Sequence, residues 1–521
     1  MDVLSLKEML AREEQAIGSG VTAAALMEAA GQAMAWRIMT TYSRVQSFLV
    51  LAGKGNNGGD GLVVARYLAR AGKEVQVVLT APEEELGDLP HAQLVQLHAE
   101  LPNLEIILWQ DDLVFPGSDG VVIDALLGVQ ARGALRGVVA QVVAKLNAAR
   151  AANFFRTVAL DLPTGLAAFE ESGSPQIGPP QERDEAVVAD LTIAVGFAKD
   201  VLSREALSAW VGRLDIVAWS NAPAQSAPRQ MLVPHELAGL LPRRNALSYK
   251  GDFGKLVIVA GSPGFTGAPA LCAQAALGMG VGLLSVVTRP DALPIVAAQA
   301  PHEAMVSGWA MGKTPDVVRD ASTIVVGPGL GVDAKTANIL SAVLAVGCPV
   351  LIDADGLNML ARNLEVLREA KGPVLLTPHV GEMARLIGRK FDPSERESVA
   401  REFVDKYNVT LVLKGTRTLV SAPGQPFFIN TTGNPGLSTG GSGDTLSGLL
   451  GALLAQGLAP LEAARLGVWL HGHAADLVLA ERGCEEGLTP TMLSAHLGAA
   501  LVSLRGQAVP PAGLLECAVS L

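Results

Sequence analysis

Short apolar runs alternate with glycine-rich loops and with segments of helical periodicity along almost the whole chain. Such alternation is typical of parallel sheets whose strands are joined by crossover helices, so it predicts an α/β fold. In the first half, a helical segment over residues 11–36 precedes predicted strands over 48–52, 75–79, 105–109, 120–124, 157–161, 191–195 and 214–217. In the second half, the predicted strands are 255–260, 283–288, 323–327, 350–353, 374–377 and 410–414, followed by a helical tail from Thr445.

The chain has 521 residues, more than one hydrophobic core of ordinary size accommodates, which predicts two or three domains. Its strongest break in composition covers residues 221–230, where two prolines and small residues occur without any aliphatic run. Such a composition is typical of a linker. We therefore expect one domain over residues 1–222 and a second over residues 228–510.

The apolar content of the chain is high enough that membrane spans need to be considered. Hydrophobic residues make up 49% and charged residues 17% of the chain, which excludes a largely disordered protein. The mean hydropathy is +0.34, and no charged residue occurs between Leu256 and Thr288. Glycines and prolines interrupt that stretch repeatedly, so we interpret it as strand, loop, helix and strand of a buried core and reject a span.

Charge and cysteine usage limit the partners of the protein. The net charge is −11, which argues against a nucleic-acid partner because such a partner requires a basic surface. The charged N-terminal residues do not resemble a secretory signal peptide, and the four cysteines stand far apart without metal-ligand spacing. We therefore expect a cytoplasmic protein with neither a nucleic-acid nor a membrane partner. A homo-oligomer is a separate expectation.

A glycine- and asparagine-rich loop over residues 53–61 follows the first predicted strand and opens a helix. Its glycines permit a close approach of the backbone to a ligand, and a helix N-terminus offers unpaired N–H groups to an anion. Its spacing matches neither G-x-G-x-x-G nor a Walker loop, so the nicotinamide fingerprint does not apply. Asn56, Asn57 and Asp60 add oxygen atoms that a tight βα turn does not need, which favours a binding loop over that alternative.

Two further strands of the first half end in aspartate, at Asp124 and Asp161. Ligands of open parallel sheets bind beyond the carboxyl ends of the strands, so both carboxylates are expected to face the crevice that holds the asparagine loop. One such aspartate is often only a helix N-cap. Two of them, together with Asn57 and Thr164, form an oxygen-only set suited to a hard cation.

The first half carries four motifs in this order: Leu-Met-Glu-Ala-Ala-Gly over 26–31, the 56–61 loop, Asp124 with the glycine loop after it, and Asp-Leu-Pro-Thr-Gly over 161–165. In these motifs and in their order, it resembles the NAD(P)H-hydrate epimerase family. The resemblance covers most of residues 1–220. For this half we expect a Rossmann-like domain with a parallel sheet. The resemblance implies that Asn57, Asp124 and Thr164 hold K⁺, with Thr164 in place of the more usual serine, and that Asp161 acts as acid or base. The substrate-binding residues that it implies are Asn56, Asn57, Gly58, Gly59, Asp60, Gly128, Val129, Gln130, Ala131, Arg132, Gly133, Ala134 and Asp161.

The densest signal of the second half is the run of small residues over 432–448, in which glycines precede a helix. Several backbone N–H groups then converge where phosphate charge can sit. Asp444 at the helix start is placed to take a proton from a hydroxyl that attacks phosphorus. The alternative, an N-cap aspartate in a flexible loop, does not explain so many small residues in one run.

Two other strand ends of the second half carry polar residues. The segment 414–418, Lys-Gly-Thr-Arg-Thr, suits the phosphates of a nucleotide, although a solvated hairpin is the alternative. His379 ends another strand and is either a structural or a functional histidine. His471 and His473 lie two residues apart on a predicted helix, face different ways and do not resemble a metal pair.

Together with the segments 261–268, 327–331 and 353–355, these motifs resemble the ADP-dependent NAD(P)H-hydrate dehydratase family over nearly all of residues 230–510. The resemblance implies a ribokinase-like α/β domain, ADP as phosphoryl donor, Mg²⁺ and Asp444 as catalytic base. The implied nucleotide-binding residues are Lys414, Gly415, Thr416, Arg417, Thr418 and Gly443, and the implied contacts to the hydrated dinucleotide are Ala268, Gly331, His379 and Asp444.

The two resemblances together imply a bifunctional repair enzyme for NADHX and NADPHX, whose nicotinamide rings are hydrated at C6. The first domain would interconvert the R and S epimers, and the second would dehydrate the S epimer with ADP, giving AMP and phosphate. Two alternatives stay open. The second domain alone permits a ribokinase-type kinase for a small alcohol, because a fold does not fix a function. The first domain could also be a binding module without catalysis.

Overall fold

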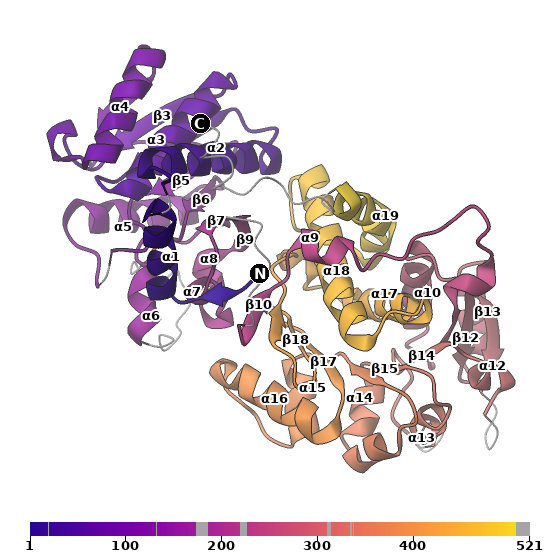
Figure 1. Ribbon diagram of the computed structural model, residues 1–521. Helices are drawn as coiled ribbons and strands as arrows, with labels where there is room; N and C mark the ends of the chain where they lie inside the picture. The colour runs from indigo at the N-terminus through magenta and orange to yellow at the C-terminus, as the bar shows by residue number, and fades with distance from the viewer. Residues whose placement is uncertain are drawn as a thin grey trace. The chain divides into compact units, whose positions relative to one another are not determined.

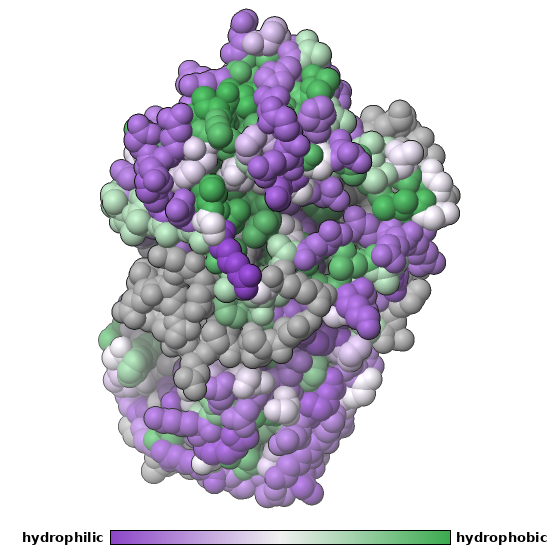
Figure 2. Space-filling model, turned by 90° about the vertical axis from the view of Figure 1, so that its left-hand side faces the viewer, coloured by the Kyte–Doolittle hydropathy of each residue, from purple (hydrophilic) through white to green (hydrophobic). Residues whose placement is uncertain are grey.

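The computed structural model describes residues 1–506 apart from residues 19, 132, 173–185, 219–226, 310–313, 334–335 and 337. The described residues form two compact units that divide the chain near residue 225 (Figure 1). Each unit has a central sheet and a hydrophobic core of its own. No helix of the described residues is both long and apolar enough to cross a membrane. On the face shown in Figure 2, hydrophobic groups are interleaved with hydrophilic side chains.

The first unit is built around a seven-stranded sheet in which every pair of neighbours is parallel. The strands, in the order in which they lie, are β4 (Glu105–Leu108), β3 (Glu74–Leu79), β2 (Ser47–Ala52), β5 (Gly120–Ala125), β6 (Arg156–Leu160), β7 (Leu191–Gly196) and β9 (Arg213–Ala218). The longer helices are α1 (Leu6–Gly18), α2 (Ala23–Thr41), α3 (Asn56–Arg70), α4 (Asp88–Glu100) and α5 (Gly137–Ala152). All strands predicted for this half are confirmed within a few residues.

The helical segment predicted over residues 11–36 is two helices in the structure, so the continuous segment is wrong. Gly20 takes a φ of +107°, which ends the helical backbone after α1. The Thr22 hydroxyl then accepts a hydrogen bond from Ala25 N at 3.1 Å and caps the start of α2. A two-stranded sheet that the sequence pattern does not predict pairs β1 (Val3–Leu4) with β8 (Ala198–Lys199). The short helices α6 (Phe169–Ser172), α7 (Asp200–Ser203) and α8 (Ser208–Val211) complete the unit.

The second unit is built around a ten-stranded sheet, parallel except where β18 pairs with β17 and β19. The strands, as they lie, are β10 (Arg229–Met231), β19 (Phe427–Ile429), β18 (Leu419–Ser421), β17 (Thr410–Leu413), β16 (Val374–Leu376), β15 (Val350–Ile352), β14 (Thr323–Val326), β11 (Lys255–Val259), β12 (Leu283–Thr288) and β13 (Met305–Gly308). The six predicted strands are confirmed. The other four, β10, β13, β18 and β19, are not among the predicted strands and have three or four residues each.

Helices cover both faces of this sheet (Figure 1). They are α9 (Pro234–Ala238), α10 (Gly267–Gly278), α11 (Leu293–Gln299), α12 (Asp316–Arg319), α13 (Ile339–Leu344), α14 (Asp355–Leu360), α15 (Val380–Ile387), α16 (Arg396–Tyr407), α17 (Ser442–Ala455), α18 (Pro460–Arg482) and α19 (Pro490–Gly506). The stretch from Leu256 to Thr288 forms β11, α10 and β12, as predicted in place of a membrane span. The predicted helical tail from Thr445 starts earlier, at Ser442.

The packing of α17 against α10 fixes the helix that carries Asp444. A Cβ atom on Gly448 would lie 1.9 Å from the carbonyl oxygen of Cys272, so only glycine permits this approach of the two helices. Leu449, Leu450 and Leu453 are fully buried in the core beneath. The first turn of α17 is therefore held rigidly at one edge of the sheet.

Candidate active sites

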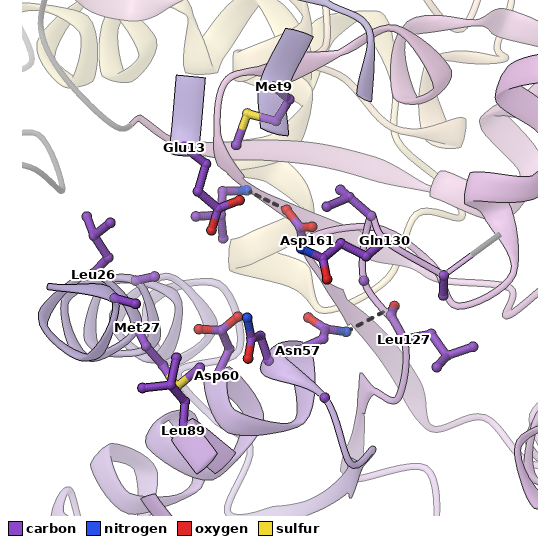
Figure 3. A pocket seen from close by; sticks show the side chains of 18 of the residues that line it. Met9, Glu13, Leu26, Met27, Asn57, Asp60, Leu89, Leu127, Gln130 and Asp161 are labelled. Carbon is purple, nitrogen blue, oxygen red and sulfur yellow. Dashed lines mark hydrogen bonds between the residues drawn. The ribbon is translucent and has the colours of Figure 1, made fainter. Parts of the chain in front are cut away.

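The first unit contains a pocket of about 220 Å³ at the carboxyl ends of β2 and β5, between which the order of the strands reverses. Ligands of doubly wound parallel sheets bind at this place. The turn that opens α3, the loop after β5 and Asp161 after β6 supply the polar lining, and α1 and α2 lie over the pocket (Figure 3). Apolar lining comes from Met9, Leu26 and Met27.

Most of the predicted substrate-binding residues of the first unit meet in this pocket. Those that line it are Asn56, Asn57, Asp60, Gly128, Val129, Gln130, Ala131 and Asp161. Gly58 and Gly59 are buried in the first turn of α3, and Gly133 and Ala134 are exposed farther along the loop after β5. Arg132 lies outside the described residues. The structure therefore brings both predicted loops and Asp161 to one place.

Two glycines allow the loops to approach so closely. A Cβ atom on Gly58 would lie 1.8 Å from the carbonyl oxygen of Gly53, and one on Gly53 would lie 1.9 Å from that of Leu126. The loop after β5 is thereby brought against the start of α3, where the Asn57 amide donates a hydrogen bond to Leu127 O at 3.1 Å.

Replacing Gly58 by alanine should therefore destabilise the first unit by about 1–3 kcal/mol, because backbone must move to accommodate the methyl group. Gly55→Ala is the matched control: it lies in the same turn, has a φ of −97° and has no atom within 4 Å of the added Cβ. Hydrogen exchange of peptides from β2 and β5 measures the stability of this unit within the full chain. Equal protection in the two variants would contradict the expected clash.

Asn57, Asp124 and Thr164 lie around the backbone of Leu127, below the pocket. The buried carboxylate of Asp124 accepts hydrogen bonds from Thr164 N at 2.8 Å and from the Thr164 hydroxyl at 2.7 Å. That hydroxyl accepts one from Leu127 N at 3.0 Å. Burial raises the pKa of Asp124 to about 6, although its hydrogen bonds oppose the rise. The Asn57 amide oxygen is buried without a hydrogen-bond partner among the described residues, which is the state of an oxygen that a cation would complete.

Asp161 is held by a lysine that the sequence pattern does not identify. Lys199 Nζ lies 2.6 Å from Asp161 Oδ1, is fully buried and also donates to Val195 O at 2.8 Å. Asp161 has a φ of +68°, an uncommon backbone conformation for a residue with a side chain. Such conformations persist where the surroundings enforce them, often at functional sites. The only sequence signal for Lys199 is a cation three residues after the strand β7.

Two further carboxyl groups face the same pocket, Glu13 from α1 and Asp60 from α3 (Figure 3). Burial, together with the negative charge of Asp161, raises the pKa of Glu13. Burial and the charges of Asp161 and Glu13 raise the pKa of Asp60 well above its usual range, although Lys199 opposes the rise. The pocket therefore combines an ion-paired carboxylate with two carboxyl groups whose pKa values are raised. Glu13 has no motif around it, and sequence reasoning missed it.

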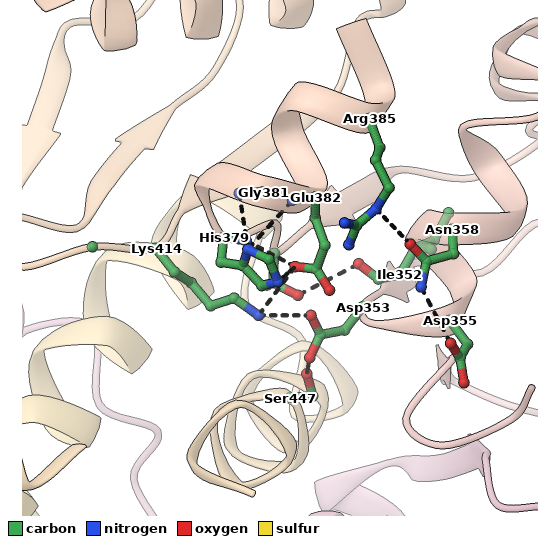
Figure 4. Close-up of polar contacts among 12 residues, drawn as sticks. Ile352, Asp353, Asp355, Asn358, His379, Gly381, Glu382, Arg385, Lys414 and Ser447 are labelled. Carbon is green, nitrogen blue, oxygen red and sulfur yellow. Dashed lines mark hydrogen bonds and ion pairs between the residues drawn. The ribbon is translucent and has the colours of Figure 1, made fainter. Parts of the chain in front are cut away.

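The candidate site of the second unit lies at the carboxyl ends of β15, β16 and β17. Asp353 Oδ1 accepts a hydrogen bond from Lys414 Nζ at 2.8 Å, and Asp353 Oδ2 accepts one from the Ser447 hydroxyl of α17 at 2.7 Å (Figure 4). Glu382 Oε2 lies 3.9 Å from Lys414 Nζ. Although burial works against the charge of Lys414, Asp353 and Glu382 raise its pKa above the usual value. The partners Asp353, Glu382 and Ser447 had no predicted role.

Asp444 lies in the first turn of α17, next to this ion pair. A Cβ atom on the neighbouring Gly443 would lie 3.5 Å from Lys414 Nζ and 3.8 Å from Asp353 Oδ2, so the glycine turn, lysine and aspartate converge. Burial and the charge of Asp353 raise the pKa of Asp444 to about 7, with Lys414 opposing the rise. A carboxylate with this pKa is matched to proton transfer near neutral pH.

His471 on α18 supports the start of α17 and is not part of a metal pair. Its ring Nε2 lies 3.0 Å from the carbonyl oxygen of Ser442, and burial lowers the pKa of His471 to about 4. The neutral ring therefore donates to Ser442 O and fixes the turn before Asp444. His473 contacts the Ser503 hydroxyl instead, at 2.9 Å.

The remaining predicted residues of the second unit occupy distinct environments. His379 caps α15, where its Nδ1 accepts a hydrogen bond from Gly381 N at 2.9 Å, and its contact to the hydrated dinucleotide stays a prediction. Gly415 and Thr416 are exposed, Thr418 is half-buried, and Arg417 is buried, which lowers its pKa to about 10. Gly331 N donates to Asp355 Oδ2 at 2.9 Å, and a Cβ atom on Gly329 would lie 3.1 Å from Ala268 Cβ. The loops that carry Ala268 and Gly331 thus meet at the same edge of the sheet.

Comparisons with known proteins match both units. A family model described as YjeF-related protein N-terminus covers residues 23–201, and one described as NAD(P)H-hydrate dehydratase covers residues 256–498. The chain is 34% identical to the bifunctional NAD(P)H-hydrate repair enzyme Nnr of Coxiella burnetii, over 93% of this chain and 96% of that one. It is also 34% identical to the protein of the same name from Escherichia coli K12, over 91% and 89% of the two chains.

Among solved structures, the second unit is similar to the ADP/ATP-dependent NAD(P)H-hydrate dehydratase from Bacillus subtilis, co-crystallised with ATP and Mg²⁺. The sequence identity is 29%, the match covers 53% of this chain and 98% of that chain, and the TM-score is 0.47.

Proposed function

The chain belongs to the family of bifunctional NAD(P)H-hydrate repair enzymes, and from this premise we propose which unit performs each step and with which residues. Residues 1–222 would epimerise R- and S-NAD(P)HX, and residues 228–510 would dehydrate the S epimer with ADP. The observation that carries the proposal is Asp444, a carboxylate with a pKa of about 7 at the glycine-rich start of a helix, beside Lys414. A general base and a phosphate-binding turn are the two parts that phosphoryl transfer to a hydroxyl requires.

The chemistry of the second unit follows from the poor leaving ability of hydroxide. Asp444 would remove the proton of the C6 hydroxyl while the oxygen of that hydroxyl attacks the terminal phosphorus of ADP and takes its phosphoryl group, releasing AMP. Phosphate then leaves C6, assisted by the lone pair of the ring nitrogen, and loss of a proton restores the reduced nicotinamide. Backbone N–H groups of the 440–443 turn, Gly415, Thr416 and Lys414 would bind the phosphates of the nucleotide.

The side chains around Lys414 are compatible with Mg²⁺. Asp353, Asp355, Glu382 and Asp444 place an excess of carboxylates around one lysine. Within the described residues, no three His, Cys, Asp or Glu side chains form a metal centre by themselves. Mg²⁺ commonly binds through one or two carboxylates together with substrate phosphates, so the ion would enter with ADP and neutralise phosphate charge.

In the first unit, Asp161 would act as acid or base at C6 of the hydrated ring. Asn56, Asn57, Asp60 and the loop after β5 would surround the nicotinamide half of the substrate, as their common pocket supports. The oxygens of Asn57, Asp124 and Thr164 fit K⁺, because they offer one carboxylate among neutral oxygens and one of them lacks a partner. The cytoplasmic location and the homo-oligomer stay predictions.

Epimerisation should accordingly depend on K⁺, and activity should fall when Li⁺ replaces it, because the smaller ion does not match this set of neutral oxygens. Dehydration of S-NADHX by the same chain, at the same ionic strength, serves as the control. Crystals soaked in Rb⁺ should show anomalous scattering between Asn57, Asp124 and Thr164. An epimerase indifferent to the cation, with no scattering there, would mean that these groups bind substrate hydroxyls instead.

The proposed division of labour is tested on purified epimers. With ADP, S-NADHX should regain the absorbance of the reduced nicotinamide at the rate of dehydration. R-NADHX should regain it only as fast as the first unit converts R-NADHX to S-NADHX. With Asp161→Asn, R-NADHX should recover no faster than by spontaneous epimerisation, whereas S-NADHX should be unaffected. An unchanged rate from R-NADHX in that variant would remove Asp161 from the mechanism, and a wild-type rate no faster than spontaneous epimerisation would make the first unit a binding module.

A further inference from the structure

Asp60 is a carboxyl group of the first pocket to which the proposed function gives a binding role but no chemical one. It lies on α3, and in Figure 3 it faces the pocket from the side opposite to Glu13 and Asp161. Within the described part of the chain, Asp60 forms no hydrogen bond or ion pair through its carboxyl group. A side chain that served only to hold α3 in place would have such a partner, as Asp124 and Asp161 do.

The charges around Asp60 distinguish it from Asp161. Asp161 is ion-paired with Lys199 at 2.6 Å. Asp60 lacks such a partner. The charges that act on it are the carboxylates of Asp161, in the turn after β6, and Glu13, on α1, and the ammonium group of Lys199, on β8. Burial and these two negative charges favour its protonated form. An acid and a base in one site are often two carboxyl groups in different environments, one beside a cation and one without.

We propose that Asp60 is the proton donor of the epimerisation and that Asp161 is its partner base. The proposal rests on the epimerase function proposed above. It assigns a catalytic role to a residue that the family resemblance places only among the substrate contacts, and it explains why one pocket holds both a lysine-paired carboxylate and one without a cation.

The step balances without any further reactant. Asp60 gives its proton to the C6 hydroxyl, the C6–O bond breaks with its electrons on the departing water, and the lone pair of N1 forms the N1=C6 bond of an iminium ion. Water then adds to the other face of C6, Asp161 takes one of its protons, and the N1=C6 electron pair returns to N1. One water has left and one has been added. Proton exchange with solvent restores both carboxyl groups, and the reverse reaction uses them in exchanged roles.

The position of Glu13 fits this assignment. α1 begins at Leu6, directly after β1, and β1 pairs with the strand that carries the lysine, with Leu4 opposite Lys199. Glu13 is thereby held at the pocket, where its negative charge disfavours ionisation of Asp60. Its neighbour Glu14 is exposed.

The first test is Asp60→Asn in the full chain, which keeps the size and hydrogen-bonding capacity of the side chain and removes its acidity. We expect kcat for epimerisation to fall by about 10²–10⁴-fold with little change in KM, the typical loss for a general acid. Asp60→Glu should recover part of that loss. If Asp60 only binds substrate, Asp60→Asn keeps kcat and raises KM, which would overturn the proposal. A wild-type chain that does not epimerise at all would instead refute the proposed function itself.

The second test uses the two adjacent glutamates. Glu13→Gln should move the basic limb of the pH profile of epimerisation to lower pH, because loss of a negative neighbour favours ionisation of the acid. Glu14→Gln, the matched control, should leave the profile unchanged. In H₂¹⁸O, wild-type epimerisation should place one solvent oxygen at C6 per turnover. An unmoved basic limb in Glu13→Gln, or retention of the original oxygen, would contradict the assignment.

Discussion

Replacing Asp444 by asparagine should lower the rate of S-NADHX dehydration by about 10²–10⁴-fold, the usual cost of removing a general base. Asparagine keeps the shape of the side chain in the first turn of α17 but cannot accept the hydroxyl proton. Epimerisation should continue at the wild-type rate, because Asp161 and its pocket belong to the other compact unit. ADP binding, measured by calorimetry, should persist, since Lys414 keeps its partner Asp353.

The pH dependence of dehydration provides an independent readout of the same carboxylate. Because burial and Asp353 raise the pKa of Asp444 to about 7, kcat/KM of the wild type should fall about tenfold per pH unit below that value. The residual activity of Asp444→Asn should lack this limb. Asp316→Asn, which removes an exposed carboxylate from the first turn of α12, is the matched control and should change neither rate nor profile. Full dehydration activity in Asp444→Asn would remove Asp444 from the mechanism.

The central strands of both sheets could be predicted because their signal is local. Each is a short apolar run, and β2 and β12, with six residues each, are examples. Four of the strands that were not predicted, β1, β8, β10 and β19, pair with partners distant in sequence. β1 pairs with β8 and β10 with β19, so two or three residues suffice once the rest of the sheet exists. Local periodicity cannot report such pairings.

The same distinction separates the predicted from the missed residues of the two sites. Asp124 lies at the end of β5, and Asp161 and Lys414 directly follow β6 and β17, so the rule that ligands bind at the carboxyl edge was sufficient to find them. Lys199 reaches Asp161 from β8, and Glu13 reaches the pocket from α1, which follows β1, the partner strand of β8. No spacing in the sequence encodes that contact. The buried ion pair between Lys199 and Asp161 is therefore a property of the fold, and it gives Asp161 a cationic partner that Asp60 lacks.

The fate of the transferred phosphate distinguishes the proposed dehydratase from a kinase of similar architecture. Both would bind nucleotide phosphates through Lys414 and the 440–443 turn, so nucleotide binding alone decides nothing. In a kinase the phosphate ester is the product and persists. In the hydrated nicotinamide the ester oxygen is attached to the carbon next to N1, whose lone pair expels phosphate as soon as the ester forms. When ADP and S-NADHX are supplied, we therefore expect AMP, inorganic phosphate and reduced dinucleotide in equal amounts.

Free phosphate is the firmer part of that expectation, because it follows from the chemistry of the ring whichever nucleotide supplies the phosphoryl group. The preference for ADP follows only from the resemblance, and with ATP as donor the same argument predicts ADP, phosphate and reduced dinucleotide. Phosphorus NMR of the complete reaction, with a control lacking nucleotide, follows all phosphorus-containing species at once, and absorbance follows the nicotinamide. A phosphorylated small molecule that accumulates in place of phosphate, with no reduced dinucleotide formed, would identify the second unit as a kinase, because only an ester without an adjacent nitrogen lone pair survives its own formation.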